Sequence, residues 1–139
     1  MGVDGPAAMD RVWRIITTES FISDVGPYMQ RFAGELIEYG FIAEARHLNP
    51  VGVIHGGCLI TFLETCMGWE TMRHAGSDSV TIQFDTHFLK SVRAGDLVIC
   101  RAANPGHAQC RLHARHLVRK RRHRDYWTGC LEKSEAGVN

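Results

Sequence analysis

The chain has 139 residues, 45% of them hydrophobic and 22% charged, and its formal net charge at pH 7 is only +1. These values are ordinary for one globular domain with a sizeable core, and no apolar run approaches membrane-spanning length. The first ten residues lack the basic-then-apolar pattern of a secretory signal, so we expect a cytoplasmic protein with no membrane partner. Five cysteines without a Cys-x-x-Cys pair indicate neither a disulfide framework nor a zinc site, and we expect no metal.

The N-terminal part of the chain is expected to cover a core rather than to build it. Residues 1–33 carry apolar side chains at loosely helical spacings that Gly26 and Pro27 interrupt, which predicts an N-terminal helical covering segment. Apolar and polar residues then alternate in part from Leu36 to Leu48, which predicts a first strand with one covered face. We place the core at residues 34–102 and treat residues 103–139 separately.

The stretch from Asn49 to Trp69 carries the readable chemistry. A turn leads through His55 and the pair Gly56-Gly57 into an apolar run without proline, which predicts a helix buried nearly all round and ending near Gly76. One strip differs, because small uncharged residues surround a single carboxylate at helical spacing. This strip is either the solvated side of the helix or the lining of a cavity, and it consists of Thr61, Glu64, Thr65 and Gly68.

The start of this helix predicts a site for a developing negative charge. Glycine lets a substrate oxygen approach free backbone N–H groups, and the helix dipole adds partial positive charge there. Eight residues separate Gly56 from Glu64, which is about 12 Å along a helix axis. One carbonyl carbon cannot contact both groups in a single helix, so joint action requires two chains related by a two-fold axis. We therefore expect a homodimer, or a dimer of dimers.

Two strands are predicted after the helix. Apolar and polar residues alternate from Val80 to Phe88, and a Gly95-Asp96 turn leads into a short apolar run from Leu97 to Cys100. The order strand, helix, strands predicts an α+β fold in which an antiparallel sheet wraps around one helix. Lys90 and Arg93 near the end of the first of these strands could hold phosphates, although surface solubility explains them almost as well.

One motif combines Asn49, the sequence His55-Gly56-Gly57 and an acid, Glu64, nine residues after the histidine. This motif resembles that of the hotdog-fold acyl-CoA thioesterases of the phenylacetate-degradation type. The similarity extends through Val80 to Asp96 and covers roughly residues 30–102. It implies that Gly56 and Glu64 are catalytic, that Asn49 orients water or the thioester carbonyl, and that His55 contacts the thioester or holds the loop. It further implies that coenzyme A enters only as part of the substrate, with no separate cofactor, and that Thr81 is a polar helper. The remaining expected substrate-binding residues are Gly57, Thr61, Thr65, Gly68, Lys90 and Arg93. Gly68 departs from relatives that carry a hydroxyl there to orient water.

The tail from residue 103 has a different character. Residues 101–139 contain 9 Lys or Arg against 3 acids, whereas residues 1–100 contain 7 against 12. We find no strand or helix period in 111–124, so this segment is not expected to supply the family's last strands. Three interpretations remain: a basic arm for nucleic acid, which lacks aromatic support; histidines as metal ligands, which lack ligand spacing; and a frameshifted reading, because dropping one base permits peptides resembling those strands.

The expected function is hydrolysis of acyl-CoA thioesters to a free acid and a thiol at a site between two subunits. Glu64 would act as general base or as nucleophile. The alternatives are an acyl-CoA-binding protein without turnover, which would not need Glu64, and an inactive truncated or frameshifted relative. The sequence does not specify the acyl group.

Overall fold

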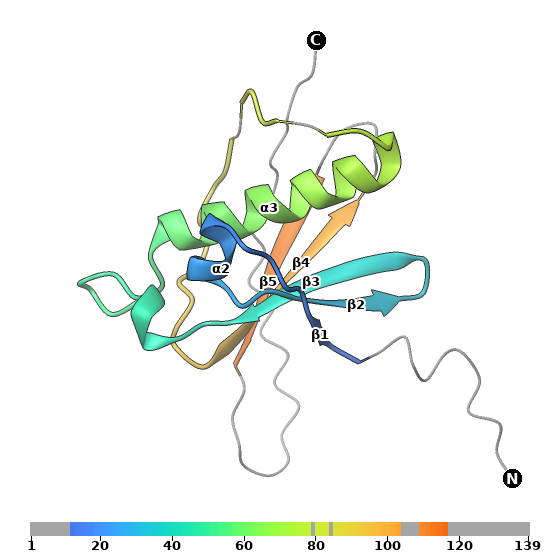
Figure 1. The fold of residues 1–139 in the computed structure, drawn as a ribbon. Coiled ribbons are helices and arrows are strands. Elements are labelled where there is room, and N and C mark those ends of the chain that lie inside the picture. The colour runs from blue at the N-terminus through green and yellow to red at the C-terminus, as the bar shows by residue number, and fades with distance from the viewer. Residues whose placement is uncertain (1–11, 79, 84, 104–108, 117–139) are drawn as a thin grey trace, which may run out of the picture.

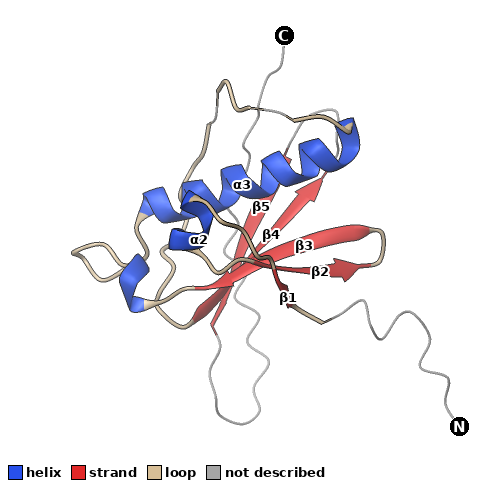
Figure 2. Cartoon of the chain, in the orientation of Figure 1, coloured by secondary structure: helices blue, strands red, loops and turns tan. Residues whose placement is uncertain are grey.

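The computed structural model describes residues 12–78, 80–83, 85–103 and 109–116. It contains one antiparallel sheet in the order β1-β2-β3-β4-β5, with the long helix α3 lying across one face (Figure 1). The strands are β1 (Arg14–Ile15), β2 (Met29–Ala33), β3 (Leu36–Ile42), β4 (Asp96–Ala103) and β5 (Gln109–His116). The helices are α2 (Phe21–Val25), the 3-10 turn η1 (Ala45–His47) and α3 (Gly56–Ala75), and Figure 2 shows α2 on the same side of the sheet as α3. The expected α+β class is confirmed.

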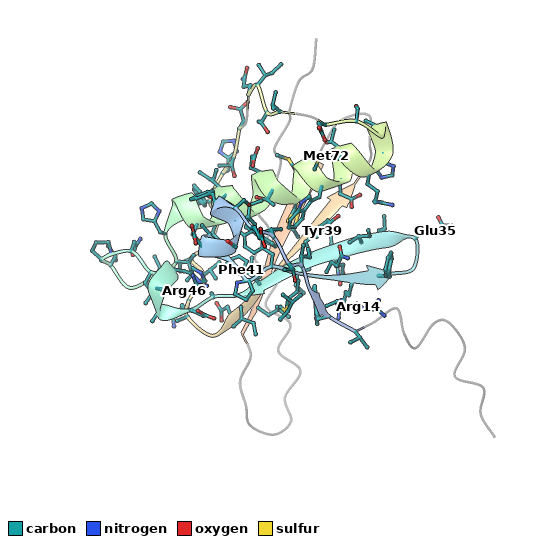
Figure 3. All side chains as sticks on the ribbon, viewed as in Figure 1. Arg14, Glu35, Tyr39, Phe41, Arg46 and Met72 are labelled. Carbon is teal, nitrogen blue, oxygen red and sulfur yellow. The ribbon has the colours of Figure 1, made fainter. Side chains whose placement is uncertain are left out.

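The core lies between α3 and the inner face of β3 and β4. Tyr39 and Phe41 point from β3 toward α3 (Figure 3), and Phe41 meets Phe62 edge-on at 4.8 Å between ring centroids. Tyr28 joins them with its ring 4.9 Å from that of Phe62. Such tilted aromatic pairs add to the stabilisation from burial. Thr65 and Met67, which lie on nearly opposite sides of α3, are both buried, and every residue from 58 to 72 is buried or half-buried. The middle of α3 is therefore covered for most of its circumference, as expected from the sequence.

The outer face of the sheet holds a buried carboxylate. Glu38 on β3 is 2% exposed and lies in register between Arg31 on β2 and Arg101 on β4. Arg31 donates to its carboxylate at 2.6 Å, and Arg101 donates to the other oxygen. Burial alone would raise the pKa of Glu38, but these two guanidinium groups outweigh burial and hold the pKa below its ordinary value.

The helix and two strands follow the sequence prediction closely. α3 begins at Gly56 and ends at Ala75, where Gly76 with φ of 67° closes the helix by donating its N–H to the carbonyl of Met72. The strand predicted from Leu36 to Leu48 is β3, which ends at Ile42 before η1 begins, so it is shorter than predicted. The strand predicted at 97–100 is confirmed within β4.

Three expectations about the elements are wrong. The described part of the N-terminal covering segment contributes two strands to the sheet, β1 and β2, and only the short α2 is helical. No strand pairing forms in the described residues of the 80–88 stretch, and Val80 and Ile82 are 89% and 85% exposed. The tail does contribute a strand, since Gln109–His116 pairs along its whole length with β4. Residues 117–139, which complete the tail, lie outside the described residues, as do residues 1–11. Within the described part, no helix is long and apolar enough to span a membrane.

Candidate active site

The loop before α3 is shaped by Asn49. Its side-chain oxygen accepts hydrogen bonds from the backbone N–H groups of Val51 at 3.0 Å and Val53 at 3.2 Å. The backbone N–H of Asn49 donates to the Val53 carbonyl at 2.7 Å. This is the local turn that Asn side chains favour, and Gly52 supplies the positive φ of 91° that the turn needs. The oxygen of Asn49 is therefore committed to the loop, which leaves its side-chain NH2 as the part able to meet a ligand.

His55 caps the start of α3. Its Nδ1 accepts the N–H of Gly57 at 2.8 Å, and its own backbone N–H donates to the carbonyl of His47 at 2.8 Å. The bare Gly57 makes this possible, because a Cβ at that position would lie 2.9 Å from His55 Nδ1. With Nδ1 as acceptor, neutral His55 carries its proton on Nε2. Of the two roles considered for His55, the structure shows the one that holds the loop.

Gly56 occupies the first helical position, and its N–H finds no acceptor among the described residues. First-turn N–H groups lack intrahelical partners and lie at the positive end of the helix dipole, so this one is available to an incoming oxygen. The ring of Phe88 lies against Gly56, with its Cζ 3.2 Å from where a Cβ would be. The donor thus lies beside an aromatic wall that the sequence did not predict.

Glu64 is half-buried on α3 and accepts a hydrogen bond from the Thr81 hydroxyl at 2.8 Å. The structure therefore brings together two of the expected site residues that are 17 positions apart. Thr81 belongs to the stretch that leaves the end of α3 and returns along the helix, and its contact with Glu64 anchors that return (Figure 1). Because the hydroxyl occupies Oε1, the second carboxylate oxygen is left to meet water or substrate.

The rest of the polar strip on α3 divides into two kinds of residue. The hydroxyls of Thr61 and Thr65 donate back to helix carbonyls, those of Gly57 and Thr61, at 2.9 and 2.7 Å. Such back-bonding satisfies a threonine within its own helix. Thr65 is buried, whereas Thr61 and Gly68 are partly exposed, and a Cβ at Gly68 would meet nothing within 4 Å. In this single chain the strip borders open space beside Gly68.

Lys90 and Arg93 are exposed in the loop that precedes β4, not at the end of a strand as predicted. The turn that follows them is well fixed. Asp96 is buried, and its carboxylate accepts the backbone N–H of Arg93 at 2.9 Å, while Gly95 with φ of 93° donates its N–H to the Ala43 carbonyl at 2.7 Å. Both cations remain candidate phosphate ligands on the basis of charge alone.

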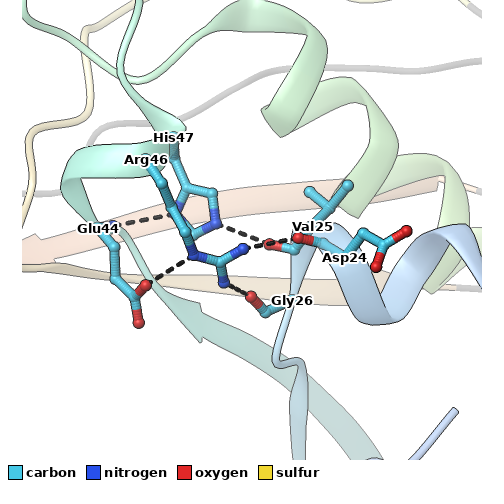
Figure 4. A network of polar contacts seen from close by, with 6 residues as sticks. All are labelled: Asp24, Val25, Gly26, Glu44, Arg46 and His47. Atoms are coloured by element: carbon cyan, nitrogen blue, oxygen red, sulfur yellow. Dashed lines mark hydrogen bonds and ion pairs between the residues drawn. The ribbon is translucent and has the colours of Figure 1, made fainter.

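A second polar network, which the sequence did not predict, connects η1 to the end of α2 (Figure 4). His47 is buried, accepts the Glu44 N–H on Nδ1 at 3.0 Å and donates from Nε2 to the Val25 carbonyl at 2.7 Å. Arg46 donates to the Glu44 carboxylate at 2.8 Å, to the Asp24 carbonyl at 2.6 Å and to the Gly26 carbonyl. These contacts tie η1 to the end of α2, and since the His47 carbonyl binds the His55 N–H, they also position the start of α3.

Another missed group is Glu70, which is 8% exposed on α3. It accepts the Tyr39 hydroxyl at 2.7 Å and the Arg73 guanidinium at 2.7 Å. Burial would raise the pKa of Glu70, but the hydrogen bonds from Arg73 and Tyr39 outweigh it and lower the pKa. Its partner Tyr39 is 31 residues away, so no local pattern could reveal the pair. Among the described residues, no three His, Cys, Asp or Glu side chains gather as a metal site would require.

Residues 51–103 match the sequence profile of the Thioesterase superfamily, a stretch that runs from the loop before α3 to the end of β4. Among curated proteins, no sequence matches the chain.

Several solved structures share the fold. A thioesterase from Haemophilus influenzae is 20% identical with a TM-score of 0.60, covering 88% of this chain and 90% of its own. The PaaI protein from the phenylacetic acid degradation operon of E. coli is 16% identical with a TM-score of 0.58, covering 86% of each chain. A Streptococcus mutans protein solved with acetyl CoA is 18% identical with a TM-score of 0.55, covering 90% of this chain and 85% of its own. At these identities the likeness is one of fold.

Proposed function

We propose that this chain, which resembles the Thioesterase superfamily over residues 51–103 and shares the fold of PaaI, hydrolyses acyl-CoA thioesters. The observation that carries the proposal is that one helix holds two groups: the Gly56 N–H, which has no acceptor among the described residues, and the half-buried Glu64, which accepts a hydrogen bond from Thr81. The fold neighbour solved with acetyl CoA supports coenzyme A esters as the substrate class.

The Gly56 N–H would donate to the thioester oxygen as that oxygen gains negative charge. Donors placed in this way contribute about 3 kcal/mol to lowering the barrier. Glu64 would accept a proton from water while the water oxygen attacks the carbonyl carbon, or its carboxylate would attack the carbon and form an anhydride that water then opens. In both routes the carbon–sulfur bond breaks, and the thiolate of coenzyme A leaves and takes up a proton.

A second copy of the chain completes the site in this proposal. Gly56 and Glu64 lie about 12 Å apart along α3, so one chain cannot present both to the same carbonyl. A two-fold arrangement would bring the helix start of one subunit to the middle of the partner helix, as a dimer or a dimer of dimers. The exposed apolar side chains of Val80 and Ile82, beside Thr81, support an interface on this side of the molecule.

The oxyanion role can be isolated with a matched pair of variants at Gly56. Proline suits the first helical position and lacks the N–H, and the preceding His55 already has a ψ of 131°, within the range that a residue before proline prefers. Gly56→Ala adds a Cβ against the same Phe88 ring but keeps the N–H. We expect Gly56→Pro to hydrolyse acyl-CoA about 100-fold more slowly than Gly56→Ala. Equal rates in the two variants would refute the donor role.

The role of Glu64 is tested by Glu64→Gln, with the exposed hairpin residue Glu35 changed to Gln as the control. Release of the thiol from short, long and aromatic acyl-CoA esters should be lost in Glu64→Gln and retained in Glu35→Gln. Coenzyme A ester binding without thiol release in any chain would favour the binding-protein alternative. No binding and no release would favour the inactive relative.

The shared site predicts complementation between two inactive chains. A mixture of Gly56→Pro and Glu64→Gln subunits, unfolded and refolded together, forms mixed dimers in which one of the two sites has both groups intact. About a quarter of the wild-type activity should return, since about half of the dimers are mixed and half of their sites are complete. Without any recovery, Gly56 and Glu64 would not act on the same substrate from two chains.

A further inference from the structure

Phe88 occupies a position next to the Gly56 donor that neither the motif nor its spacing indicated. The three heavy atoms nearest to a Cβ at Gly56 all belong to the Phe88 ring, at 3.2, 3.6 and 3.7 Å. The ring therefore covers one side of the first helical residue. The rest of Phe88 is open, with 49% of the residue exposed. The ring therefore lies within reach of the carbon chain attached to an oxygen at the Gly56 N–H.

The ring is held in place from both sides along the chain. After Phe88, the Val92 carbonyl accepts the N–H of Ile54 at 2.8 Å, and the Val92 side chain is buried in the core. Before it, Thr81 is bonded to Glu64. The stretch carrying Phe88 is thus fastened to the loop before α3 and to the middle of α3, which makes the ring a fixed wall of the site.

We propose that Phe88 contacts the acyl carbons next to the thioester carbonyl and makes the site prefer an uncharged acyl chain to one that carries a carboxylate. The inference rests on the proposed function and names its substrate class. An apolar wall stabilises methylene groups by removing them from water, whereas a carboxylate beside it loses hydration without gaining a partner.

The matched substrates are butyryl-CoA and succinyl-CoA, which share a four-carbon acyl chain and differ in the terminal carboxylate. The quantity measured is the ratio of their kcat/KM values in wild type, Phe88→Ala and Phe88→Leu, with the neighbouring exposed Leu89 changed to Ala as the control. The ratio should fall about ten-fold in Phe88→Ala and less in Phe88→Leu, because leucine keeps an apolar wall. It should stay unchanged in Leu89→Ala. Lys90 and Arg93 are present in every chain, so any attraction they exert on the carboxylate cancels.

Binding separates this inference from the proposed hydrolysis. Analogues of both esters with a methylene in place of the thioester sulfur cannot be hydrolysed, and their dissociation constants can be measured by calorimetry on the same chains. A binding ratio that falls in Phe88→Ala supports the inference even if no chain releases thiol. The same ratio in wild type and in Phe88→Ala, or no binding of either analogue to wild type, overturns it. Thermal unfolding of Phe88→Leu checks that the variant is folded.

Discussion

Two glycines of α3 should respond differently to the same substitution. Gly68 lies in the helix interior, and a Cβ there would meet nothing within 4 Å, so Gly68→Ala gains helix propensity without a clash. That gain is roughly 0.5–1 kcal/mol. Gly57 lies in the first turn, and its Cβ would lie 2.9 Å from His55 Nδ1, the atom that now accepts the Gly57 N–H. The imidazole would have to leave, and loss of a helix cap costs about 0.5–2 kcal/mol.

Gly57→Ala should therefore be less stable than Gly68→Ala by about 1 kcal/mol, the contribution of the cap. Urea unfolding at neutral pH measures this difference directly, and thermal unfolding should show it as a gap of roughly 4 °C in Tm. The same substitution in a His55→Ala background is the control. There the cap is already absent, so Gly57→Ala should regain the ordinary benefit of alanine. The capping argument would be refuted if alanine changed the free energy of unfolding equally at Gly57 and Gly68. It would also be refuted if Gly57→Ala had the same effect with His55 present and with His55→Ala.

Three further outcomes follow from the buried polar groups. Because the pKa of Glu38 is lower in the folded chain than its ordinary value of 4.5, its stabilisation is complete above that value and is lost as the pH falls through the folded pKa. Urea midpoints should therefore fall as the pH is lowered below 4.5, and should fall less in Glu38→Gln. Tyr39→Phe removes the hydroxyl that donates to buried Glu70 and should cost roughly 1.5–3 kcal/mol in the same assay, with no effect if the hydroxyl is dispensable. Arg46→Lys should lower the free energy of unfolding by about 1 kcal/mol, because a lysine ammonium cannot reproduce the planar guanidinium that donates to three acceptors. An unchanged Tm would contradict this.

The sequence was sufficient to predict elements whose signals are local. The glycine pair and the uninterrupted apolar run predicted the start of α3, and Gly76 predicted its end within one residue. The contact of Glu64 with Thr81 joins two residues that the resemblance had already selected. The catalytic roles of these residues stay predictions.

Alternation of apolar and polar residues indicates that one face of a segment is covered, but it does not identify a neighbouring strand. This explains the errors made in predicting the strands. Val80 and Ile82 alternate with polar residues as a strand would, but no described strand pairs with them. β5 was missed for the opposite reason. Its small or apolar residues Cys110, Leu112 and Ala114 do alternate with basic residues, but the high density of charge concealed the period. β5 weakens the interpretation that the whole tail is frameshifted, since the first part of the tail already extends the sheet.

The buried polar groups lay beyond sequence reasoning because their partners are distant along the chain. Arg101 lies 63 residues from Glu38, and Tyr39 lies 31 residues from Glu70. Each acid looks like an ordinary surface charge until the strands and α3 are packed. Phe88 at Gly56 is a contact of the same kind: alternation placed the ring in a strand, and only the return of the chain along α3 placed it beside the donor.

The contact between Trp13, which precedes β1, and Gly40 on β3 has a consequence for how homologues would vary. The Trp13 side chain lies so close to Gly40 that a Cβ there would be 2.9 Å from the indole, and Arg31 lies over the Trp13 ring, 4.5 Å from its centroid. A side chain at position 40 would require the indole at position 13 to move. Lineages that lose this glycine should also lose the tryptophan, and the two positions should change together although 27 residues separate them in the sequence.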